Sequence, residues 1–116
     1  ADLVTKFVDD PTLTPDAEGE AIASALGKNK VAMMPHHGSV HCGDSLENTV
    51  AETISFGIAC QYQLDAIRFG GEPMSRQLAS SYKDSYYKYG FREQMWLANY
   101  RRLRLSDPDL FAALDQ

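Results

Sequence analysis

The chain has 116 residues, 44% of them hydrophobic and 10% aromatic, which is enough for one compact domain with one core and too little for two. Its 16 acidic and 11 basic residues give a formal net charge of -5, which argues against broad electrostatic binding to nucleic acid or to an anionic membrane. No stretch approaches the roughly 18 consecutive apolar residues of a membrane span, and the N-terminus lacks the pattern of a signal peptide. We therefore expect a soluble protein without nucleic-acid or membrane partners.

The two cysteines, Cys42 and Cys60, are too few for a disulfide framework. They fall on a predicted strand and in the middle of a predicted helix, and Cys42 has no flanking charges that would make it a nucleophile. A reducing, cytoplasmic location is the expectation.

The N-terminal region predicts a strand and then a helix. Residues 3–8 alternate apolar and polar side chains, which fits an edge or final strand. Thr14 suits an N-cap, Pro15 suits the first helical position, and Gly27 suits the residue after a helix end. The pattern predicts a helix over 15–26.

The segment with the three histidines reads as strand, turn and strand. The apolar run over 31–34 predicts a buried strand, residues 36–38 a turn or bulge, and residues 39–42 a return to extended structure. Neighbouring residues on a regular strand point to opposite faces, so His36 and His37 face one metal ion only if the turn redirects one of them. His41 shares the parity of His37, but an extended chain places it about 13 Å away. From these residues alone, a metal ligand and a histidine hydrogen-bonded beside the sheet both stay open.

A long helix follows and ends near Phe69. Asp44 with Glu47 predicts a capping box of the D-x-x-E kind, and Gly70 with the glycine after it predicts the end. Gly57, inside this helix, costs about 1 kcal/mol relative to Ala. We therefore expect a close contact with a neighbouring backbone at that glycine.

Further helices are predicted over 75–89, 91–104 and about 107–114. The order of strand, helix, two strands and then helices predicts an α/β fold whose sheet is thin for so many helices, so part of the sheet is expected to lie outside this chain. Four tyrosines fall in the first of these helices, where either packing or a site role for one hydroxyl is open: Tyr82, Tyr86, Tyr87 and Tyr89.

Residues 18–68 resemble the second half of the class II aldolase/adducin domain. The resemblance rests on a helix ending in Leu26-Gly27, a basic turn, the apolar strand, the His-His-Gly turn at 36–38, a capped acidic helix start and a helix end of the form A-C-x-x-Q-L at 59–64. Pro-His-His-Gly-Ser also resembles a turn in metallo-β-lactamase-like hydrolases, but the capped helix with its A-C-x-x-Q-L end follows the aldolase pattern.

This resemblance implies a three-layer αβα domain with a mixed or antiparallel central sheet flanked by helices. Residues 1–70 would be the C-terminal half of that domain and residues 71–116 a helical C-terminal extension. The chain would then be part of a longer polypeptide and would pair with the N-terminal segment of the same domain, in an assembly that is a homotetramer in the family's enzymes.

The resemblance also implies the chemistry. The histidine before the glycine, His37, would be the third protein ligand of a catalytic Zn²⁺ or another divalent metal, with a His-x-His pair and a catalytic acid/base Glu lying outside this chain. The implied enzyme is a lyase that cleaves or forms a carbon-carbon bond beside the carbonyl of a small sugar-like substrate, with the metal stabilising an enediolate. Two alternatives remain open, a non-catalytic adducin-like interaction module and a family epimerase or decarboxylase.

Overall fold

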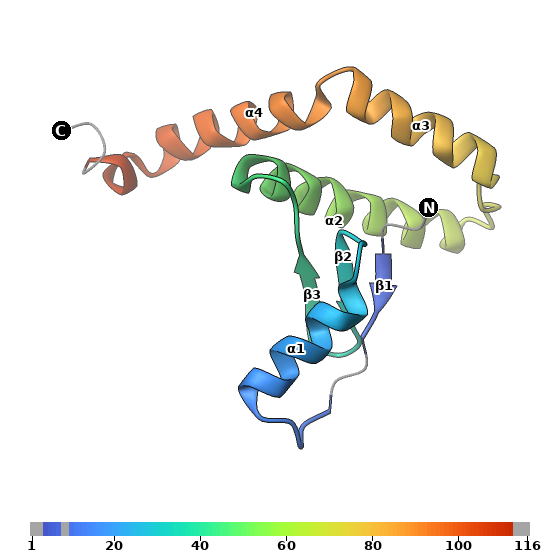
Figure 1. Ribbon diagram of the computed structural model, residues 1–116. Helices are drawn as coiled ribbons and strands as arrows, with labels where there is room; N and C mark the ends of the chain where they lie inside the picture. Colours follow the sequence, from blue (N-terminus) through green and yellow to red (C-terminus); the bar gives the residue numbers. More distant parts are fainter. Residues whose placement is uncertain (1–3, 8–9, 113–116) are drawn as a thin grey trace. The chain divides into compact units, whose positions relative to one another are not determined.

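The computed structural model describes residues 4–7 and 10–112. They belong to two compact units, residues 1–44 and residues 45–116 (Figure 1). The sequence predicts a boundary at residue 70, between the family's domain and a C-terminal extension. That boundary describes the extent of the family's domain rather than a compact unit, and it stays a prediction. Within the described ranges, no helix is long and apolar enough to cross a membrane.

The first unit is a small sheet with one helix on it. Three strands, β1 (Val4–Lys6), β2 (Val31–Met34) and β3 (Gly38–His41), form a sheet in the order β1-β2-β3. Strand β2 is parallel to β1 and antiparallel to β3, so the sheet is mixed. The α/β class with a mixed sheet is confirmed.

Helix α1 (Pro15–Leu26) is the parallel crossover between β1 and β2 and contacts both strands. Its ends match the sequence prediction: the Thr14 side chain accepts a hydrogen bond from the Ala17 backbone N–H, and Gly27 has a positive φ of 53°. The core of this unit consists of four buried side chains from β2, from the end of α1 and from the residue after β1: Phe7, Leu26, Val31 and Ala32.

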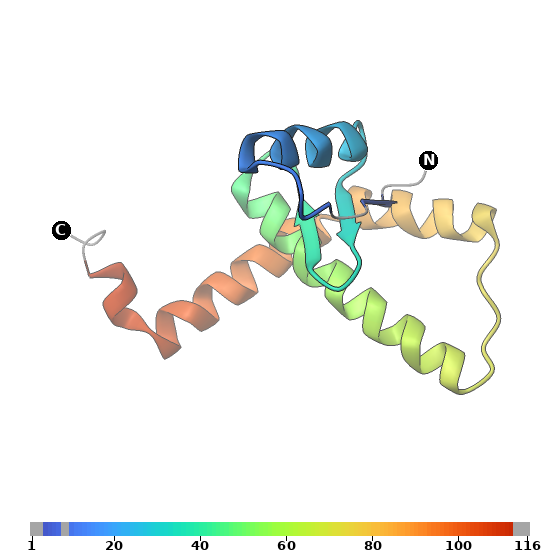
Figure 2. The ribbon, with the colours of Figure 1, turned by 90° about the horizontal axis from the view of Figure 1, so that it is seen from below.

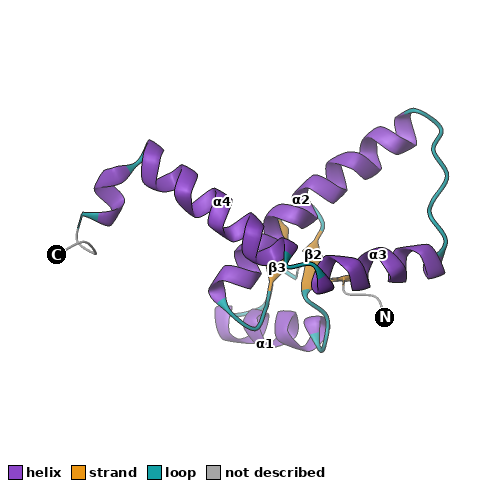
Figure 3. Cartoon of the chain, turned by 90° about the horizontal axis from the view of Figure 1, so that it is seen from above, coloured by secondary structure: helices purple, strands orange, loops and turns teal. Residues whose placement is uncertain are grey.

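The second unit is helical. It contains α2 (Leu46–Arg68), α3 (Arg76–Lys88), α4 (Phe91–Ser106) and a short 3-10 helix, η1 (Pro108–Phe111). Figures 2 and 3 show α2 and α3 far apart at the 69–75 loop and close together near the junction of α3 with α4. The helix predicted over about 107–114 is a 3-10 helix, η1, in its described part, and residues 113–116 lie outside the described residues.

One residue joins the three long helices. The Arg92 guanidinium of α4 lies 3.3 Å from a Glu52 carboxylate oxygen of α2, and both side chains are mostly buried, at 16% and 14% exposure. The same guanidinium lies 4.9 Å from the ring centroid of Tyr87 on α3. The arginine can bind both neighbours because its guanidinium group is planar. The N–H groups at its edge bond to the carboxylate, while its flat face stacks on the aromatic ring.

The predicted end of α2 is confirmed in detail. The Gly70 N–H donates to the Ile67 carbonyl and the Gly71 N–H to the Ala66 carbonyl, which are the two hydrogen bonds of a Schellman motif. Gly70 has a φ of 72°, a conformation that glycine adopts without a steric cost. The glycine pair therefore stops the helix where the sequence indicates.

Two predictions about α2 are wrong. Its N-cap is Ser45 rather than Asp44: Ser45 is extended and its hydroxyl accepts a hydrogen bond from the Asn48 backbone N–H. This shift by one residue moves Glu47 out of the position that a capping box requires. Gly57 is exposed, and a Cβ placed on it would meet nothing within 4 Å, so the expected backbone contact is not formed.

The capping assignment gives the first testable prediction. Replacing Ser45 by Ala leaves the Asn48 N–H without its side-chain acceptor and should lower the free energy of unfolding by about 1 kcal/mol. Ser45→Asp restores an acceptor and should recover most of the loss. Urea unfolding followed by circular dichroism measures both, and equal stabilities of Ser45→Ala and the parent chain would contradict the assignment.

Candidate functional site

The His-His-Gly sequence forms the tight turn between β2 and β3. Met34 pairs with Gly38, so only residues 35–37 lie outside the strand ladder. The His37 backbone N–H donates to the Met34 carbonyl at 3.1 Å, and Pro35 and His36 are the two central residues of the turn that this bond closes. Pro35 presets the first central position, while His36 has a φ of 68° at the second, which fits a type II turn.

His36 is the one residue other than glycine with a positive φ within residues 4–7 and 10–112. L-residues rarely adopt this conformation, yet asparagine, aspartate and histidine tolerate it better than most. The first histidine of the His-His-Gly turn therefore has a backbone role, because its position takes a left-handed conformation. His36 shapes the turn, and the next residue occupies the position expected of the ligand.

His37 lies at the tip of the hairpin with an exposed side chain. An imidazole there can offer one ring nitrogen to a divalent ion, because the turn rather than the strand pleat sets its direction. Among the described residues, no group of three or more His, Cys, Asp or Glu side chains comes together in a way that could hold a metal. The chain thus presents one candidate ligand at this turn.

The His41 ring forms a hydrogen bond within β3. Its Nε2 atom lies 2.8 Å from the Ser39 hydroxyl, two residues back on the same face of β3. Partial burial lowers the pKa of His41 below its ordinary value of 6.5. The neutral ring is therefore favoured, which suits a histidine hydrogen-bonded beside the sheet.

The cysteines form no disulfide. Cys42 is exposed just after β3, and Cys60 is half-buried in α2.

The tyrosines of the predicted tyrosine-rich helix differ in exposure. Tyr86 is half-buried, while Tyr82 is 62% exposed.

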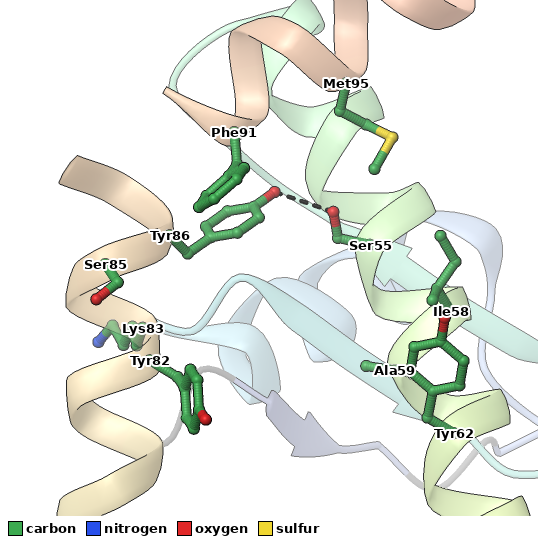
Figure 4. Close-up of a pocket in the computed structure, with 10 residues that line it drawn as sticks. All are labelled: Ser55, Ile58, Ala59, Tyr62, Tyr82, Lys83, Ser85, Tyr86, Phe91 and Met95. Carbon is green, nitrogen blue, oxygen red and sulfur yellow. Dashed lines mark hydrogen bonds between the residues drawn. The ribbon is translucent and has the colours of Figure 1, made fainter. Parts of the chain in front are cut away.

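Both of these tyrosines line a pocket of about 630 Å³ in the helical unit, which the sequence alone did not predict (Figure 4). Its walls come from the middle of α2, from α3 and from the start of α4: Ser55, Ile58, Ala59, Tyr62, Tyr82, Lys83, Ser85, Tyr86, Phe91 and Met95. The only signal in the sequence was the density of tyrosines, which does not indicate their partners some 30 residues away on α2.

The left-handed turn residue yields a prediction about stability. His36→Asn should leave the free energy of unfolding nearly unchanged, whereas His36→Val should lower it by about 1–2 kcal/mol, because a β-branched residue is strained at positive φ. Chemical denaturation of the two variants tests this, and a His36→Val protein as stable as His36→Asn would rule out the left-handed conformation.

The shifted histidine yields a prediction about pH. An unfolded chain with an ordinary imidazole binds protons more readily than the folded chain, so the stabilisation from neutral His41 is fully present above about pH 6.5 and declines below it. His41→Gln should therefore lose less stability than the parent chain between about pH 7.5 and about pH 5. Urea midpoints at the two pH values measure the difference, and identical losses in both proteins would contradict the prediction.

The chain was compared with curated proteins, with solved structures and with models of protein families. No curated protein and no solved structure matches the chain. The family model described as the Class II Aldolase and Adducin N-terminal domain matches residues 4–64, from β1 through the turn to the last third of α2. This match covers more than half of the sequence and includes the three strands, α1 and both adjacent histidines. The chain therefore belongs to the class II aldolase and adducin N-terminal domain family.

Proposed function

We propose that this chain contributes to a metal-dependent lyase of the class II aldolase type, with His37 as a protein ligand of the metal. The observation that carries the proposal is the coincidence of the family match with an exposed histidine at a tight turn. The resemblance implies that the histidine directly before the glycine of the turn is a metal ligand, and in this chain that histidine is His37.

The turn fits a metal ligand by the chemistry of its donors. A divalent ion of the zinc type binds neutral imidazole, and its ligands must be held in a fixed direction if the site is to form without a large entropic cost. The bond between the His37 N–H and the Met34 carbonyl fixes the backbone of His37, and Gly38 follows with a φ of 152°, at which side chains other than that of glycine are strained. The backbone on both sides of the imidazole is thus determined locally.

In this proposal, the chain's own role is to hold one imidazole in place. A divalent ion such as Zn²⁺ would supply Lewis acidity toward the carbonyl of a small, sugar-like substrate. His37 would offer one ring nitrogen to the ion from the tip of the hairpin. The acid/base residue and the remaining ligands would come from other residues of the assembled domain.

The proposal extends to the assembly. It takes this chain as the C-terminal half of a three-layer αβα domain, pairs it with the N-terminal segment of that domain, and places the protein in a cytoplasmic homotetramer like the family's enzymes.

Metal content of the assembled protein tests the ligand assignment. His37→Ala should strip the divalent ion during purification, because a three-histidine site that loses one ligand binds metal at least about tenfold more weakly. His36→Asn is the matched control and should keep the metal, since it preserves the turn while removing the neighbouring imidazole. Native mass spectrometry with elemental analysis measures chain composition and bound metal together.

Two outcomes would overturn the proposal. Equal metal loss in both variants would show that the turn, rather than His37, matters for the site. A parent protein that carries no divalent metal, even after incubation with Zn²⁺, would favour the adducin-like interaction module instead.

A further inference from the structure

The pocket in the helical unit is a second candidate site, and it differs from the histidine turn in its chemistry. Its volume of about 630 Å³ lies within the range of roughly 300–1,000 Å³ that is usual for small-molecule sites. All ten lining residues belong to the helical unit, residues 45–116.

Aromatic rings form much of the wall. Tyr86 and Phe91 stack on one another, with ring centroids 6.1 Å apart and planes 23° apart. Tyr62 and Tyr82 add two further rings from opposite helices, and they are 70% and 62% exposed. An aromatic ligand that packs against these rings would be stabilised, because each contact between aromatic rings adds about 0.5–1.5 kcal/mol to the free energy gained by burying apolar surface.

A pair of hydroxyls supplies the polar contact. The Ser55 and Tyr86 oxygens lie 3.0 Å apart and share one hydrogen bond (Figure 4). Each hydroxyl has one hydrogen and two lone pairs, so the pair keeps one O–H donor and acceptor capacity after its own bond is made. A ligand that carries a hydroxyl or carbonyl group can use what remains.

The lining offers no charge to a ligand. Lys83 is the one ionisable amine or carboxylate among the ten lining residues, and its ammonium group lies on the side of α3 turned away from α2 (Figure 4). A charged ligand would lose hydration there without gaining a partner, which is costly. The surroundings therefore favour a neutral molecule.

We propose that this pocket binds an uncharged aromatic molecule of one or two fused rings that carries a hydroxyl or carbonyl group. The ring lies against the tyrosines of α2 and α3, and its polar group bonds to the Ser55–Tyr86 pair. This site is independent of the metal chemistry proposed for His37.

The test is a titration of the full chain with 2-naphthol, followed through the methyl NMR signals of Ile58 and Met95. Both signals should shift saturably, while the methyls of Leu105, which is 86% exposed on α4, should not. Tyr86→Phe should weaken binding about five- to tenfold through the lost hydroxyl. The matched control, Tyr89→Phe, removes a hydroxyl outside the lining and should leave the affinity unchanged.

Two further measurements complete the test. The anion 2-naphthoate has nearly the same shape and should bind at least about tenfold more weakly. Ala59→Trp, which fills the pocket from α2, should abolish the shifts. Unchanged affinity in Tyr86→Phe, or shifts spread evenly over the methyls, would overturn the proposal. So would self-association of the ligand-free chain that Ala59→Trp abolishes, because the occupant would then be a second copy.

Discussion

The hydrogen bond from the His37 N–H to the Met34 carbonyl is the constraint on which the histidine turn and its two strands depend. A three-residue loop closed in this way sets the pairing of Met34 with Gly38 and hence the register of β2 against β3. Ser39 and His41 lie two residues apart on β3 and therefore share one face of it, where they bond to each other. Moving the turn by one residue would carry the Ser39 and His41 side chains together to the opposite face of the sheet.

The sequence predicted much of this fold because most of its elements carry their own local signals. Thr14 and Pro15 start α1, and the glycine pair after Phe69 ends α2, through hydrogen bonds made within a few residues. The apolar run of β2 and the family resemblance both predicted a turn directly after that strand. The predicted position of His37 at a turn followed from neighbours in the chain, so no knowledge of distant contacts was needed.

The errors have equally definite causes. Asp44 and Ser45 are both good N-caps, and only the extended backbone of Ser45, with its hydroxyl on the Asn48 N–H, decides between them. Gly57 suggested a close neighbour, yet α2 is open at that point. The pocket was missed because it needs Ser55 of α2 beside Tyr86 of α3, a contact across 31 residues that no local pattern encodes.

The two candidate sites also relate differently to the family. The match ends at residue 64, so the whole histidine turn lies inside it, together with Glu52 and Ser55 of α2. The partners of those two side chains, Arg92 and Tyr86, lie beyond the match. The turn therefore lies wholly within the part of the chain that the family model matches. The helical pocket combines a family helix with two helices outside the match, and its ligand has to be inferred from the side chains that line it.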